Sequence, residues 1–241
     1  MDRLLDVIEA VQAHPGLGVG EIAEHCGVPF STAYRLMRTL SARGWVVPAQ
    51  RGRYLLGPRA LSMGGALPFG DLLQAVARPE LARLALRCKG HAHLGILEND
   101  MVTYLVKQSH ARGGLHSREG QQLEAYCSAL GKILLARLDG EDLDRYLAGG
   151  GFVPLTRATI TDPAALAEHL QGVREQGWAA DMGEVAPDLF CVAVAVPVVD
   201  SSLPAAISVS SRTLGPERVM GLLPALRESA AAIATKLSLP D

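Results

Sequence analysis

The sequence lacks a long hydrophobic run. No stretch of its 241 residues approaches the ~20 apolar residues that a membrane-spanning helix needs. The chain opens directly with an amphipathic segment, residues 2–13, and not with the apolar core behind a short basic stub that marks a secretory signal peptide. We therefore expect a cytoplasmic protein that does not enter a membrane.

Cysteine is also scarce. The four cysteines, at positions 26, 88, 127 and 191, form no C-x-x-C pair, which argues against a disulfide framework and against a structural zinc site. Neither the glycines at 16, 18 and 20 nor the Gly131-Lys132 pair has the spacing of a nucleotide-binding loop. Reduced thiols and no resident cofactor are expected.

One segment lacks acidic residues altogether. From Gly27 to Ala60 the sequence has six arginines and no aspartate or glutamate, although the formal net charge of the chain is −2. Residues 29–40 repeat apolar side chains with a 3.6-residue period, which leaves a basic opposite face. A shorter helix is predicted over 21–26, and Gly27-Val28-Pro29 separates the two, with Pro29 as a first helical residue. Extended residues 45–47 and 54–56 then flank a turn and predict a β-hairpin wing.

This order of elements favours DNA binding. A basic amphipathic helix alone is commonly just a solvated face, so the helix pair by itself decides little. A wing with arginines at its tip, together with the missing carboxylates, suits a surface that lies against phosphates. The segment is therefore interpreted as a winged helix-turn-helix.

Helical and extended patterns interleave over the rest of the chain. A helix is predicted at 2–13, a short one at 59–63, and a longer one from Pro68 to about Cys88. Further helices are predicted at 126–138, 164–176 and 216–237, and strands at 91–98, 101–107, 179–184, 191–199 and 205–211, with an extended stretch at 115–117. The pattern predicts an α/β or α+β body with a central sheet.

Three stretches resemble the IclR family of bacterial transcriptional regulators. GEIAEHCGVPFSTAYRLMRTLSARGWV...GRYLLGPRAL is similar to the family's winged-helix head, and SREGQQLEAYCSALGKILLA and REQGWAADMGEVAPDLFCVAVAVPV resemble its effector-binding domain. The resemblance implies an α+β protein with a DNA-binding domain over 1–59 and linker helices with dimer contacts over 60–88. It also implies a GAF-like α/β effector-binding domain with a central antiparallel sheet over 89–241. The implied function is ligand-responsive regulation, with repression as the expected sign, and no enzymatic activity.

The residues expected to contact DNA lie on the second helix and the wing. A dimer or tetramer is expected to present two such helices to successive major grooves of an inverted-repeat operator in double-stranded DNA. Contacts to base edges or nearby phosphates are expected from Ser31, Thr32, Tyr34 and Arg35, and contacts to phosphates or the minor groove from Arg38, Arg51 and Arg53.

The resemblance also implies an effector pocket. Its lining residues are expected to be Ala129, Leu130, Asp181, Cys191, Ser208 and Ser210. The spacing of the two serines adds independent support, because residues two apart in an apolar strand direct both hydroxyls to one face of the sheet. Buried hydroxyls need partners, and a small carboxylate held by them and by free N–H groups at a helix start would supply these. The expected effector is an aliphatic keto or hydroxy acid or an aromatic acid, although both serines can instead face solvent.

Two departures from the family pattern leave other functions open. Glu124-Ala125-Tyr126 stands where relatives commonly have Pro-x-His, and Phe190 replaces a frequent arginine before Cys191. A metal held by Cys127, Cys191 and Asp181 would make the protein a metal-responsive regulator; His91 and His93 are a weaker pair for such a site.

An enzyme of small-acid metabolism with an adventitious basic hairpin is the other alternative. The sequence has no nucleophile elbow, and Asp181 has no second carboxylate at a matching strand end. Steeply salt-dependent, sequence-selective DNA binding would distinguish a regulator from an enzyme.

Overall fold

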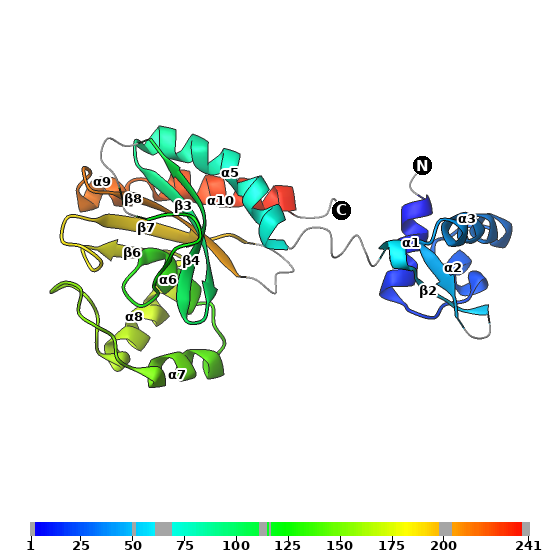
Figure 1. The fold of residues 1–241 in the computed structure, drawn as a ribbon, viewed down its shortest axis with the longest axis horizontal. Coiled ribbons are helices and arrows are strands. Elements are labelled where there is room, and N and C mark those ends of the chain that lie inside the picture. The colour runs from blue at the N-terminus through cyan, green and yellow to red at the C-terminus, as the bar shows by residue number, and fades with distance from the viewer. Residues whose placement is uncertain are drawn as a thin grey trace. The chain divides into compact units, whose positions relative to one another are not determined.

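The chain forms two compact units, Met1–Pro68 and Phe69–Asp241. The computed structural model describes residues 3–49, 52–60, 69–110, 115, 117–197 and 204–237 (Figure 1). No helix within these ranges is both long enough and apolar enough to cross a bilayer.

The first unit is a helix-turn-helix followed by a two-stranded wing. Its helices are α1 (Arg3–Ala13), α2 (Val19–His25) and α3 (Phe30–Ala42), and β1 (Val46–Pro48) pairs antiparallel with β2 (Tyr54–Leu56). The apolar stripes of the helices meet in one core with the first wing strand: Val7, Val11, Ile22, Met37, Leu40 and Val46. Pro29 lies one position earlier than predicted, as the N-cap of α3, and Gly27 turns the chain with a φ of 61°.

A six-stranded sheet forms the centre of the second unit. The strands are β3 (His91–Glu98), β4 (Met101–Ser109), β5 (Gln122–Glu124), β6 (Ala179–Met182), β7 (Phe190–Ala195) and β8 (Ala205–Ser211), in the order β5-β4-β3-β8-β7-β6. Every neighbouring pair is antiparallel, as the family resemblance implied. The short edge strand β5 was not predicted, and Leu115 and Ser117, the described residues of the expected extended stretch, lie in no strand.

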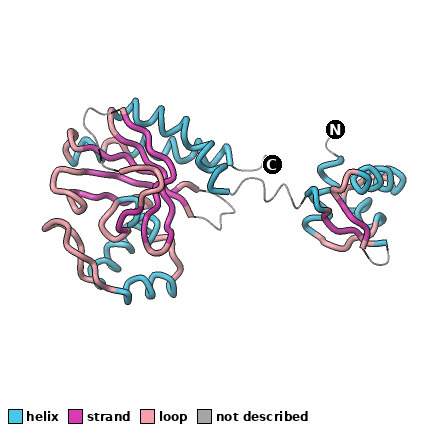
Figure 2. The backbone as a smooth tube through the Cα atoms, in the orientation of Figure 1, coloured by secondary structure: helices cyan, strands magenta, loops and turns pink. Residues whose placement is uncertain are grey.

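Helices cover both faces of this sheet (Figures 1 and 2). One core joins α5 (Phe69–Cys88) and α10 (Leu223–Leu237) to one face, and a second core joins α6 (Ala129–Leu135) and α8 (Pro163–Gln176) to the other. All seven residues of β8 are buried, because the strand has a helical layer on each side. Its alternation sends Ile207 and Val209 to the α5 side and Ser208 and Ser210 to the α6 side.

Two helix boundaries differ from the sequence prediction for local reasons. The helix expected from Tyr126 begins only at Ala129, because Ser128 caps it by accepting a hydrogen bond from the Gly131 N–H at 3.0 Å. The predicted helix 216–237 is divided into α9 (Pro216–Met220) and α10. Pro224 has no N–H to donate to the carbonyl four residues earlier, which favours a break there.

Helix α7 (Gly140–Gly149) was not predicted at all. It starts after Asp139, whose carboxylate accepts a hydrogen bond from the Asp142 N–H at 2.8 Å. By contrast, α8 follows the prediction closely. Its cap is Asp162, and Gly177 ends it in the left-handed conformation that the sequence indicated.

Candidate functional site

The second unit contains a cavity beside the start of α6. It brings together all six residues expected to line an effector pocket: Ala129, Leu130, Asp181, Cys191, Ser208 and Ser210. Its volume is about 170 Å³. That is close to the ~150 Å³ of an engineered apolar cavity in another protein that binds benzene, so the space suits a small ring or a short chain.

The start of α6 presents free backbone donors to this cavity. The N–H groups of a helix's first turn have no intrahelical acceptor, and Ala129 and Leu130 occupy that turn. Gly131 is held so close to the preceding loop that a Cβ atom there would lie 2.0 Å from the Ala125 carbonyl oxygen. Glycine at 131 is therefore required by this close approach.

Neutral polar side chains form the sheet side of the cavity. The Ser208 and Ser210 side chains are buried and stand opposite His93 on β3 and Cys191 on β7, respectively. His93 Nε2 lies 3.0 Å from Ser117 Oγ, and its Nδ1 has no hydrogen-bond partner among the described residues. Burial, with smaller contributions from the charges of Lys107 and His91, lowers the pKa of His93 to about 3, so the imidazole is neutral.

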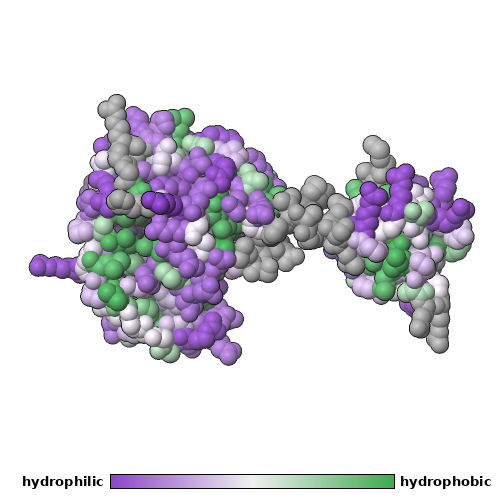
Figure 3. Space-filling view, viewed as in Figure 1, coloured by the Kyte–Doolittle hydropathy of each residue, from purple (hydrophilic) through white to green (hydrophobic). Residues whose placement is uncertain are grey.

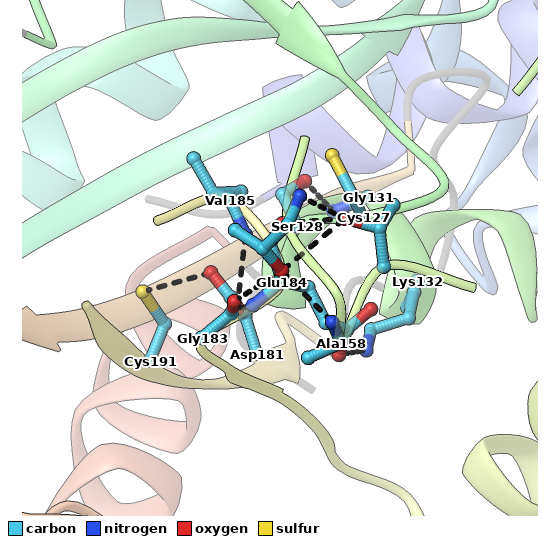
Figure 4. Close-up of polar contacts among 12 residues, drawn as sticks. Cys127, Ser128, Gly131, Lys132, Ala158, Asp181, Gly183, Glu184, Val185 and Cys191 are labelled. Atoms are coloured by element: carbon cyan, nitrogen blue, oxygen red, sulfur yellow. Dashed lines mark hydrogen bonds and ion pairs between the residues drawn. The ribbon is translucent and has the colours of Figure 1, made fainter. Parts of the chain in front are cut away.

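Asp181 closes another side of the cavity and is fully buried. Its Oδ1 accepts hydrogen bonds from the N–H groups of Glu184 at 2.6 Å and Val185 at 3.4 Å, and its Oδ2 lies 3.7 Å from the Cys191 thiol (Figure 4). Burial raises the pKa of the Asp181 carboxyl, and these hydrogen bonds and the Lys132 charge oppose that rise. Asp181 therefore fixes the turn after β6 while facing the ligand space.

A buried ion pair that the sequence analysis missed joins α6 to the same turn. Lys132 has no exposed surface, and its ammonium group contacts the Glu184 carboxylate. Glu184 Oε2 has no hydrogen-bond partner among the described residues, and burial raises the pKa of this carboxyl. The available signal was a lysine inside the otherwise apolar helix SALGKILLA, where a buried charge requires a partner.

The described residues give no support to the metal hypothesis. No group of three histidine, cysteine or acidic residues among them is arranged to hold a metal ion. Burial raises the pKa of the Cys127 thiol to about 12 and that of Cys191 well above its ordinary value, so both thiols are protonated in the metal-free protein. His91, of the weaker pair, lies with Nδ1 2.7 Å from Ser109 Oγ.

In the first unit, helix α3 exposes most of the residues expected to contact DNA. Ser31, Arg35 and Arg38 are exposed on the face opposite the core, Tyr34 is exposed beside the core face, and Thr32 is half-buried. Arg53 on the wing is exposed but donates a hydrogen bond to the Gly16 carbonyl, and its guanidinium lies 3.9 Å from Glu21. Arg51 lies outside the described residues.

Comparisons with known proteins cover both units. Residues 1–49 match the family model of the IclR helix-turn-helix domain, and residues 71–237 match that of the bacterial transcriptional regulator IclR C-terminal domain. The HTH-type transcriptional regulator BhcR of Paracoccus denitrificans is 35% identical over 216 residues, covering 89% of this chain and 77% of that protein. KdgR of Escherichia coli, another HTH-type transcriptional regulator, is 31% identical over 250 residues, covering 99% of this chain and 92% of that protein.

A solved structure shares the fold of the whole chain. The crystal structure of an IclR homolog from Microbacterium hydrocarbonoxydans, complexed with 4-hydroxybenzoate, aligns with a TM-score of 0.64 and 26% identity, covering 98% of this chain and 97% of that chain. The relatives are regulators and not enzymes. The chain therefore belongs to the IclR family and is a ligand-responsive, DNA-binding transcriptional regulator.

Proposed function

We propose that the protein is a repressor controlled by a small carboxylate-bearing metabolite that binds in the cavity beside α6. The observation that carries the proposal is the convergence of neutral hydrogen-bond donors there: the hydroxyls of Ser208 and Ser210 and the free N–H groups of Ala129 and Leu130. Such donors stabilise an anion without the desolvation cost of burying a second full charge.

The rest of the lining favours an aromatic hydroxy acid over a long chain. Tyr104, Leu123 and Leu189 supply apolar walls, and the small volume limits the ligand to about one ring. Asp181 can accept a hydrogen bond from a hydroxyl at the other end of the ligand, if its carboxyl is ionised, or donate one if it is protonated. The 4-hydroxybenzoate complex of the Microbacterium homolog has this ligand chemistry, which supports the proposal.

A homodimer is proposed from an exposed apolar stripe on α5. Leu72, Ala75, Pro79, Ala82 and Leu86 are all exposed, and their spacing alternates between three and four residues. That is the spacing of a coiled-coil seam, which needs a partner helix to bury it. We propose that the same stripe of a second copy covers it. The linker and dimer role proposed for residues 60–88 rests on this stripe.

We further propose that the dimer binds an inverted-repeat operator through α3 of each copy. If Arg35 binds a guanine bidentately, Arg35→Ala should weaken operator binding by about 1 to 3 kcal/mol. Arg157→Ala removes the same charge from the second unit and serves as the matched control. Unchanged affinity of the Arg35 variant would exclude Arg35 from the base contacts.

Thermal unfolding tests the effector. We expect 4-hydroxybenzoate, at about a hundred times its Kd, to stabilise the second unit by about 2.7 kcal/mol, which raises the unfolding temperature by several degrees. Ser208→Ala should reduce this shift, whereas Asp162→Ala removes the cap of α8, away from the cavity lining, and should lower only the unliganded melting temperature. Benzoate, 4-hydroxybenzyl alcohol and pyruvate separate the contributions of the carboxylate, the hydroxyl and the ring. A shift from the alcohol equal to that from the acid would refute the carboxylate assignment.

A further inference from the structure

Two aromatic rings are exposed at the beginning of α3. Phe30 is 60% exposed and Tyr34 is 50% exposed, and their rings lie nearly parallel with centroids 6.3 Å apart. Both hydrophobic and hydrophilic residues reach the surface of the first unit (Figure 3). The pair is distinctive because it combines large apolar area with a fixed mutual geometry.

The fold of the unit does not require this pair. Helix α3 packs through Ala33, Met37 and Leu40, which are almost completely buried. Phe30 and Tyr34 are one helical turn apart and lie beside that face, so their stacking stabilises the helix only slightly. Exposed apolar rings of this size are instead typical of a binding surface.

The neighbouring side chains indicate what binds there. Arg35 and Arg38 lie on the same exposed side of α3, and no carboxylate occurs between Gly27 and Ala60. A surface with this charge is complementary to a nucleic acid. In a helix-turn-helix, the N-terminal residues of the second helix contact base edges in the major groove, and Phe30 is the first residue of α3.

The major-groove edges of the bases offer one apolar group, the C5 methyl of thymine. We propose that Phe30 and Tyr34 form an apolar contact with a thymine methyl group, so that this aromatic pair determines part of the sequence specificity. The contact differs in kind from the polar and charged contacts of Ser31, Arg35 and Arg38. It rests on the proposed entry of α3 into the major groove.

Replacing thymine by deoxyuridine removes only the methyl group and therefore tests the contact. The probe is a duplex that the full-length protein selects from a random-sequence library. Each thymine is then replaced singly by deoxyuridine, and the ratio of the two dissociation constants is measured. Burial of one methyl-sized group is worth about 0.8 kcal/mol, so we expect about fourfold weaker binding at the contacted thymine.

Variants assign the effect to the rings. Phe30→Ala or Tyr34→Ala should bring the thymine-to-deoxyuridine ratio at that position to one, whereas Tyr34→Phe should keep it. Leu5→Ala is the matched control, because Leu5 is 59% exposed on α1 of the same unit. Circular dichroism checks that each variant keeps its helical content. The thymine-to-deoxyuridine ratio of the wild-type protein is measured without any substitution, so it does not depend on whether a variant folds.

The outcomes separate this inference from the function on which it rests. If no duplex is selected, α3 does not read DNA and both proposals fail. If a duplex is selected but every wild-type ratio is one, the thymine contact alone is refuted. A ratio that persists in both alanine variants also overturns the inference, because the methyl is then contacted by another residue.

Discussion

Removing one member of the Lys132–Glu184 pair should destabilise the second unit severely. In Lys132→Met the Glu184 carboxylate loses the one cationic contact that it makes among the described residues, and its side chain is only 8% exposed, so solvent compensates little. Breaking a buried ion pair in this way costs about 3 to 5 kcal/mol. A domain is stable by only about 5 to 15 kcal/mol, so between about a fifth and all of the stability would disappear.

Replacing both members should restore most of that loss. The double variant Lys132→Met, Glu184→Leu leaves no charge buried, and such apolar replacements are neutral or stabilise by up to about 4 kcal/mol. The two single substitutions are therefore expected to be strongly non-additive. The loss in Lys132→Met should also shrink as the pH falls toward 5, because burial raises the pKa of Glu184 and the unpaired carboxyl then takes up a proton.

Urea unfolding followed by tryptophan fluorescence measures this effect in one unit. The chain has two tryptophans, one in each unit, so a Trp45→Phe background leaves Trp178 as the reporter of the second unit. The matched control is Arg145→Met, which breaks an exposed ion pair with Asp142 on α7 and should leave the midpoint unchanged.

Either of two results would refute the reasoning. A loss below about 1 kcal/mol in Lys132→Met would mean that Glu184 is neutral or solvated, and that the pair contributes no more than an exposed one. A double variant as unstable as the sum of the single variants would mean that the two side chains fill space independently. In both cases the charge interaction would not be what holds α6 to the turn after β6.

Three further substitutions test other parts of the fold. Gly131→Ala should destabilise by about 3 kcal/mol or more in urea, because the new Cβ overlaps the Ala125 carbonyl; tolerance would show that the loop moves. His93 is neutral when folded and has a pKa of about 3, so protonation opposes folding and stability should fall as the pH drops below about 6.5, by roughly 2 kcal/mol at pH 5. His93→Gln should abolish that part of the slope. Leu40→Ala should lower the free energy of unfolding of the first unit by about 2 to 5 kcal/mol, measured by the fluorescence of Trp45. A smaller loss would mean that neighbouring side chains move to fill the space left by Leu40.

The elements set by local chemistry could be predicted from the sequence. The 3.6-residue stripe of α3, the Asp162 cap of α8 and the two-residue spacing of Ser208 and Ser210 each depend on residues close together in the chain. The strand period alone cannot tell which face a strand buries. Ser208 and Ser210 were therefore placed toward a ligand only with the help of the family resemblance.

Features that depend on distant residues could not be predicted. Lys132 and Glu184 are 52 residues apart, and nothing in the helix SALGKILLA identifies its partner. The edge strand β5 has only three residues and exists because it pairs with Met101 to Thr103 of β4. The prediction of a single helix at 216–237 did not allow for Pro224, which lacks the N–H group that a continuous helix needs at that position.

The cavity and the ion pair share the same two structural elements. Helix α6 supplies Ala129 and Leu130 to the cavity and Lys132 to the pair, while the end of β6 supplies Asp181 to the cavity and the turn that follows it supplies Glu184 to the pair. If the proposed effector bonds to both elements, any change in their separation has to strain or relax the Lys132–Glu184 contact, because a packed core does not deform continuously. The ion pair therefore opposes any arrangement of the second unit that separates α6 from the turn after β6. An effector can favour such an arrangement only if it binds it more tightly by at least the free energy that the pair loses.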